Sequence, residues 1–198
     1  MIDFSRRKKV ILFFALLVIG GYLVVVLARS SDVSVPNEFS EARMNGALIA
    51  RDIVDLSSQS VDDLKLINSL DKKGDFTAAI DVITQTVHTG WQIREKAIDL
   101  SRSLENMTNS LSGIKSTEAR QLAFESISNR LALISRLVNY STYLGQLLEV
   151  LRHRFTGDFS DGDQVPVIIS KINEEIQAIN EMNVAADKAI KKFDELIK

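Results

Sequence analysis

The sequence predicts an all-α protein: an N-terminal transmembrane helix followed by an antiparallel four-helix bundle of long helices. Three observations support this class. Residues 10–28 form an apolar run without a charged side chain. Four later segments place apolar residues at alternating steps of three and four, which is the period of amphipathic helices. The 198 residues include only two prolines, as expected for long uninterrupted helices.

Residues 10–28 have the length of a membrane-spanning helix. At 1.5 Å per residue they extend about 28 Å, close to the thickness of a bilayer's hydrocarbon core. Residues 6–9 are all basic, whereas Arg29 alone follows the run. This asymmetry predicts a single-pass signal anchor with a cytoplasmic N-terminus and the bulk of the chain outside.

The predicted organisation has four parts. The basic N-terminus comprises residues 1–9, the transmembrane anchor residues 10–28, the linker residues 29–37 and the extracytoplasmic bundle residues 38–198. The apolar run is longer than the core of a typical signal peptide, which favours retention as an anchor. Ala28 nevertheless ends an acceptable cleavage site, so a cleaved and secreted bundle is the alternative.

Local signals delimit the first two helices of the bundle. Asn37 is the predicted N-cap of the first, and its apolar stripe shifts phase after residues 57–60, which predicts a kink or two short helices. Gly74 is predicted to end this segment and Asp75 to cap the next helix. The apolar period of the second helix breaks around residues 88–91, where we expect an interruption.

The third and fourth helices have wide or regular apolar faces. Ser116 is the predicted cap of the third, which ends near the basic residues 152–154. Asp163 is the predicted cap of the fourth, whose heptads continue to the chain's end with one polar interruption at Asn183. Such heptads are typical of coiled-coil packing, where a core asparagine often sets register. Short joints predict antiparallel neighbours.

Residues 66–83 resemble the centre of a tetratricopeptide repeat, with Gly74, Asp75 and Phe76 at the turn between two apolar stretches. The resemblance covers about one repeat, and nothing recurs at the period of about 34 residues that an array requires. It implies a helical hairpin at this turn.

Composition excludes several classes of function. Residues 30–198 carry a net charge of −6 and no cluster of basic and aromatic residues, which argues against nucleic-acid binding. The absence of cysteine excludes disulfides, cysteine-ligated metals and thiol nucleophiles. No hydrolase, metalloprotease or phosphate-loop motif occurs, and Glu174 and Glu175 are predicted on the outer face of the fourth helix. We therefore expect neither enzymatic activity nor a cofactor.

The expected interruption of the second helix suggests a ligand site. A helix break beside an aromatic residue can line a small pocket, and His88 lies next to Trp91, the single tryptophan, at this point. Accommodation of the irregularity within the bundle is the alternative explanation.

The loop before the fourth helix carries three carboxylates, Asp158, Asp161 and Asp163, which are candidate calcium ligands. An EF-hand needs acids at alternate positions and a later bidentate glutamate, and this loop has neither. A solvated turn with Asp163 as a helix cap explains the same residues, so no metal site is predicted.

These observations predict a membrane-anchored helical bundle with a structural or interaction role, as a scaffold or adaptor, on the extracytoplasmic face. Its expected partners are the lipid bilayer and a membrane or envelope protein. Two alternatives stay open: a ligand-sensing module with its pocket at the helix break, and the secreted bundle. Self-association is a further expectation, through Gly20 and Gly21 or through the seam of the fourth helix.

Overall fold

The computed structural model describes residues 35–157 and 164–197, and within these ranges the chain is helical without strands. The elements are α2 (Asn37–Lys73), α3 (Phe76–Ser110), the short 3₁₀ helix η1 (Leu111–Gly113), α4 (Thr117–Phe155) and α5 (Val165–Leu196). The predicted all-α bundle of four long helices is confirmed. The predicted anchor and the loop carboxylates Asp158, Asp161 and Asp163 lie outside the described residues.

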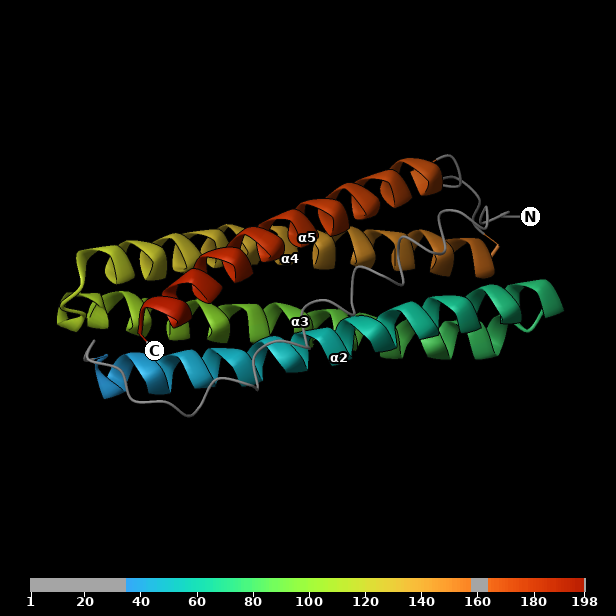
Figure 1. The fold of residues 1–198 in the computed structure, drawn as a ribbon. Helices are drawn as coiled ribbons and strands as arrows, with labels where there is room; N and C mark the ends of the chain where they lie inside the picture. Colours follow the sequence, from blue (N-terminus) through green and yellow to red (C-terminus); the bar gives the residue numbers. More distant parts are fainter. Residues whose placement is uncertain (1–34, 158–163, 198) are drawn as a thin grey trace.

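The four helices form two antiparallel hairpins, α2–α3 and α4–α5, which meet mainly through α3 and α4. In Figure 1, α5 crosses in front of α4 and brings the chain's C-terminal end toward the beginning of α2. None of the helices in the described part of the chain is long and apolar enough to cross a membrane.

Three predicted helix boundaries are confirmed by their hydrogen bonds. Gly74 ends α2 in the left-handed conformation, with φ of 74°. The Asp75 carboxylate accepts a hydrogen bond from the Ala78 amide at 3.2 Å. The Ser116 hydroxyl accepts one from the Ala119 amide at 3.2 Å. These caps satisfy backbone groups that a helix end leaves without partners.

Two boundaries in α2 differ from the prediction. Asn37 is the first helical residue and not the N-cap, because the carbonyl of Pro36 already accepts the Ser40 amide at 3.2 Å. The segment is also one continuous helix across residues 57–60, so the alternative of two short helices is wrong. Ser57 and Ser60 are buried there, and serine side chains in the core interrupt the apolar stripe without ending the helix.

The predicted interruption of the second helix is wrong, because α3 continues without a break through residues 88–91. The buried face at this level is made by Thr86, Thr89 and Gly90. The Ser141 hydroxyl on α4 donates a hydrogen bond to the Gly90 carbonyl at 2.8 Å. Small and polar residues therefore form the buried face of α3 at this level, toward α2 at Thr86 and toward α4 at Gly90, and they look like a lost apolar period in the sequence.

The apolar seam of the fourth helix lies inside the protein's own core. Along α5 this seam is almost completely buried, at Ile172, Ile176, Ile179, Asn183, Ala186, Ile190 and Phe193. α5 packs mainly on α4 of the same chain. The seam is therefore covered within the chain itself, and self-association of the protein stays a prediction.

The turn between α3 and α4 lies against the entrance to α2. A Cβ atom added at Gly113 would come within 2.5 Å of the Pro36 ring, closer than real Cβ atoms approach a neighbour. The absence of a side chain at Gly113 thus lets η1 contact the residues that lead into the bundle.

Two glycines give a matched test of the fold. We expect Gly74→Ala to lower the free energy of unfolding by about 1 kcal/mol, because a Cβ is strained at positive φ. Gly145 lies inside α4 with nothing within 4 Å of an added Cβ. Gly145→Ala should therefore raise stability by about 0.5–1 kcal/mol through helix propensity. Thermal unfolding followed by circular dichroism measures both, and equal effects would contradict this assignment.

Candidate functional site

A bidentate ion pair joins the beginning of α2 to the end of α5. The guanidinium of Arg43 donates to both carboxylate oxygens of Asp194, at 2.7 and 2.8 Å. Beside it the rings of Phe39 and Phe193 are in contact, with centroids 5.6 Å apart. Asp194 is only 4% exposed, so its charge depends on Arg43 for compensation.

A second pair lies one heptad earlier on α5. Arg130 on α4 donates to Asp187 at 3.1 Å, and both side chains are largely buried. Burial lowers the pKa of Arg130 and raises the pKa of Asp187, while each charge opposes the shift of the other. The nearby charge of Arg43 further lowers the pKa of Arg130. Arg43, Arg130, Asp187 and Asp194 thus form a neutral buried polar cluster.

The core asparagine lies four residues before this cluster. Asn183 is 4% exposed, as its position in the apolar seam predicted, and its amide nitrogen has no hydrogen-bond partner in the described structure. Sequence reasoning missed the cluster itself. The available signal was the pair of acids Asp187 and Asp194, one heptad apart on a helix whose apolar seam already contained a polar residue.

Glu175 was predicted on the outer face of the last helix, and this prediction is wrong. The residue is buried, with only 6% of its surface exposed. Its carboxylate accepts a hydrogen bond from the Asn139 amide at 3.2 Å and lies 3.4 Å from the Arg136 guanidinium. The prediction considered only the central seam of α5, whereas α4 also covers the flank that carries Glu175. Its neighbour Glu174 is exposed.

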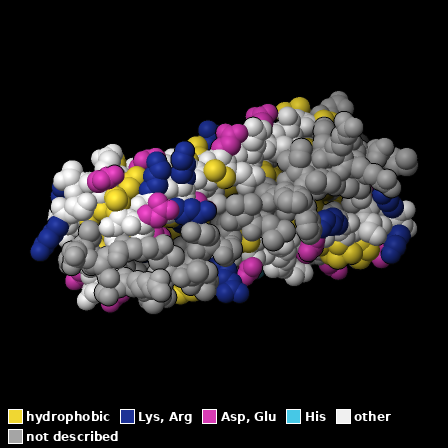
Figure 2. All heavy atoms as spheres, viewed as in Figure 1, with side chains coloured by type: hydrophobic (Ala, Val, Ile, Leu, Met, Phe, Trp, Pro, Cys, Tyr) yellow, Lys and Arg dark blue, Asp and Glu magenta, His cyan; other side chains and the backbone are white. Residues whose placement is uncertain are grey.

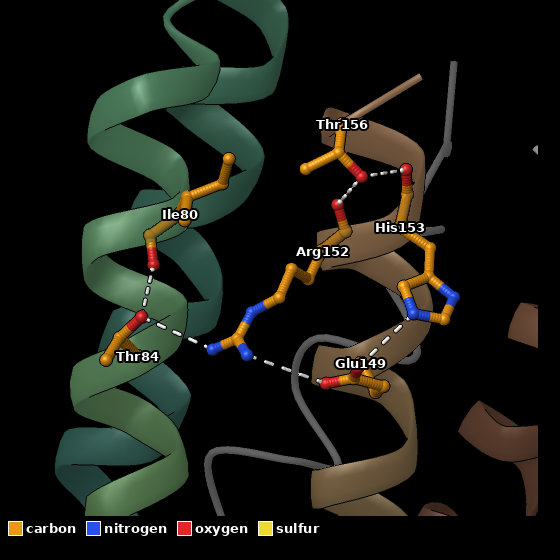
Figure 3. Close-up of polar contacts among 6 residues, drawn as sticks. All are labelled: Ile80, Thr84, Glu149, Arg152, His153 and Thr156. Atoms are coloured by element: carbon orange, nitrogen blue, oxygen red, sulfur yellow. Dashed lines mark hydrogen bonds and ion pairs between the residues drawn. The ribbon is translucent and has the colours of Figure 1, made fainter. Parts of the chain in front are cut away.

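Figure 3 shows the polar contacts at the end of α4. Arg152 donates to the Thr84 hydroxyl on α3 at 3.3 Å, and His153 lies 3.3 Å from the Glu149 carboxylate. The Thr156 hydroxyl donates to the carbonyls of Arg152 and His153, at 3.2 and 2.9 Å. The predicted basic helix terminus is confirmed, and these contacts stabilise the helix end.

The predicted ligand residues His88 and Trp91 lie on adjacent turns of the unbroken α3. Their rings meet edge to face with centroids 6.4 Å apart. Both residues are exposed, Trp91 to 66%. A pocket formed by a break in the helix, as the sequence suggested, is therefore not available. Ligand binding to the exposed pair stays a prediction.

The described part of the chain contains no group of three His, Cys, Asp or Glu residues arranged to hold a metal ion. Figure 2 shows acidic and basic side chains interspersed on the visible face of the described residues. Neither positive nor negative charge predominates on this face. Large apolar side chains are also exposed on several helices, among them Trp91, Ile98, Phe124 and Leu131.

Comparison with known proteins finds no matching family model, no matching curated protein and no matching solved structure.

The buried polar cluster can be tested by removing one charge. Asp194→Ala leaves Arg43 without its partner, and we expect a loss of about 3 kcal/mol in the free energy of unfolding. Asp62 pairs with Lys65 at 2.6 Å, but both side chains are more than half exposed. Asp62→Ala should therefore cost less than about 0.5 kcal/mol. Chemical denaturation of the purified full chain measures both.

A double substitution separates the charge pair from its packing. Arg43→Met with Asp194→Leu replaces both charges by apolar groups of similar size, and it should recover most of the stability lost in Asp194→Ala. Failure of the double variant to recover stability would show that the pair itself is net stabilising.

Proposed function

We propose that this protein is a single-pass, membrane-anchored helical bundle with a structural or interaction role, as a scaffold or adaptor, on the extracytoplasmic face of its membrane. The observation that carries the proposal is the uncharged run of residues 10–28 with four basic residues before it. Such a run partitions into a bilayer, and the basic residues keep the N-terminus on the cytoplasmic side.

The arrangement of the bundle is compatible with a tether at its N-terminal end. α2 begins at Asn37, so eight residues separate Ala28 from the first helical residue. Helices of 32–39 residues extend roughly 48–58 Å at 1.5 Å per residue. A bundle of this length, held by so short a linker, offers long helical faces to partners on or near the membrane.

A binding role suits the chemistry better than catalysis. The Arg43–Asp194 and Arg130–Asp187 ion pairs are compensated within the chain, so neither provides a free nucleophile, acid or base. The ligand-sensing alternative loses its main support because α3 is unbroken, and no other contact among residues 35–157 and 164–197 favours it. A membrane or envelope protein is the partner that we propose.

Fractionation of cells that express the full chain with a C-terminal tag tests the anchor. We expect the protein in the membrane fraction after alkaline washing, and we expect external protease to remove the tag in cells whose outer layers are permeable. Leu17→Arg with Val24→Arg should release it, because each central arginine costs about 2.5–3.5 kcal/mol in insertion. Leu48→Arg, on the exposed face of α2, is the matched control.

The same experiment distinguishes the secreted alternative. A shortened chain in the soluble fraction, with Arg29 as its first residue, would contradict the anchor. Ala28→Phe removes the small residue that cleavage requires, so it should restore the full length in that case. A tag that protease cannot reach would contradict the proposed orientation.

A further inference from the structure

Four large apolar side chains are exposed on the outside of α3 and α4. They are Trp91 and Ile98 on α3 and Phe124 and Leu131 on α4, exposed to 66%, 48%, 50% and 43% respectively. We call this set the outer stripe. Each pair is separated by seven residues, so its members lie on one face of their helix.

An exposed hydrogen bond shows that both pairs border the same seam. Arg94 on α3 donates to the Thr142 hydroxyl on α4 at 2.9 Å. Trp91 and Ile98 lie three residues before and four residues after Arg94, on its face of the helix. Leu131 and Phe124 precede Thr142 by 11 and 18 residues, close to three and five whole turns. The outer stripe therefore follows the solvent side of the α3–α4 seam.

The contacts between α3 and α4 also give the order along the seam. Gly90 lies beside Ser141 and Thr84 beside Arg152, so the helices are antiparallel. Counting from these contacts places Leu131 at the level of about residue 102 and Phe124 at about residue 109 of α3. The order is Trp91, Ile98, Leu131, Phe124, over roughly 25–30 Å.

This order is self-complementary under one two-fold axis. An axis across the stripe at the level of residues 98–100 packs α3 of one copy on α3 of the other, and α4 on α4, both antiparallel. Trp91 of one copy then lies level with Phe124 of the other on the neighbouring helix, and Ile98 lies level with Leu131 in the same way. Isologous contacts of this kind are the commonest form of protein dimer.

The charges beside the stripe select the same axis. Glu95 and Arg102 are exposed on α3, four residues after Trp91 and Ile98, and their midpoint is at the same level. Arg94 and Glu105 have their midpoint there too. An antiparallel pair of α3 helices thus places Glu95 of one copy near Arg102 of the other. It likewise places Arg94 of one copy near Glu105 of the other. A parallel pair would place Arg94 against itself and Glu105 against itself, which is unfavourable.

We infer that the outer stripe is the interface of an antiparallel homodimer, with a second copy of this chain as its occupant. A stripe of this length on two helices about 10 Å wide covers roughly 500–600 Å² per copy, or about 1,100 Å² in total. This is the lower end for specific interfaces, so the dimer is weak and reversible. The inference does not depend on the proposed membrane anchor.

Trp91 provides the readout, because it is the single tryptophan and would be buried in the dimer. With the full chain in detergent micelles, we expect its fluorescence to shift to the blue as the protein-to-micelle ratio rises, in parallel with dimer formation in analytical ultracentrifugation. Ile98→Asp or Leu131→Asp should weaken dimerisation about 100-fold or more, because each change affects the interface twice. Leu48→Asp, an equivalent change on α2, should have no effect.

Charge reversal tests the orientation. Glu95→Arg alone and Arg102→Glu alone should each weaken the dimer about 5–20-fold, and the two together should restore it, because opposite charges face each other again. A monomer at every concentration, or equal effects of Leu131→Asp and Leu48→Asp, would overturn the interface. Single reversals without effect would overturn the antiparallel arrangement.

Discussion

The packing of α3 on α4 joins the two halves of this protein. Each half is a hairpin of long helices, and the hairpins meet mainly along these two helices. Within this contact, the Ser141 hydroxyl donates a hydrogen bond to the Gly90 carbonyl, and Leu144 packs beside the same glycine. On the outside of the same seam, further bulky apolar side chains face solvent.

Much of the fold was predictable because its signals are local. Gly74, Asp75 and Ser116 act on backbone groups within a few residues of themselves, so the sequence reveals their roles without knowledge of the neighbours. The burial of Glu175 and the pairing of Arg43 with Asp194 were not predictable in this way. They depend on which helix lies beside which flank, over separations of 36 and 151 residues.

The wrong expectation at residues 88–91 has a related cause. Hydrophobic periodicity treats threonine and glycine as signs of exposure, but in a close contact between helices small residues are buried. The candidate ligand site at His88 and Trp91 was therefore inferred from buried small residues, which the sequence pattern presented as a break in the helix. What remains there is the exposed Trp91, whose importance comes from its alignment with residues on another helix.

The close approach of Gly113 to Pro36 has a mechanical consequence. The chain enters α2 through a position held by the α3–α4 turn, and Phe39 and Arg43, one and two turns later, contact the end of α5. A pulling force that reaches the beginning of α2 would thus load α2, the turn and α5 together. Peeling α2 away alone would first require breaking the contacts with the Phe193 ring and the Asp194 carboxylate.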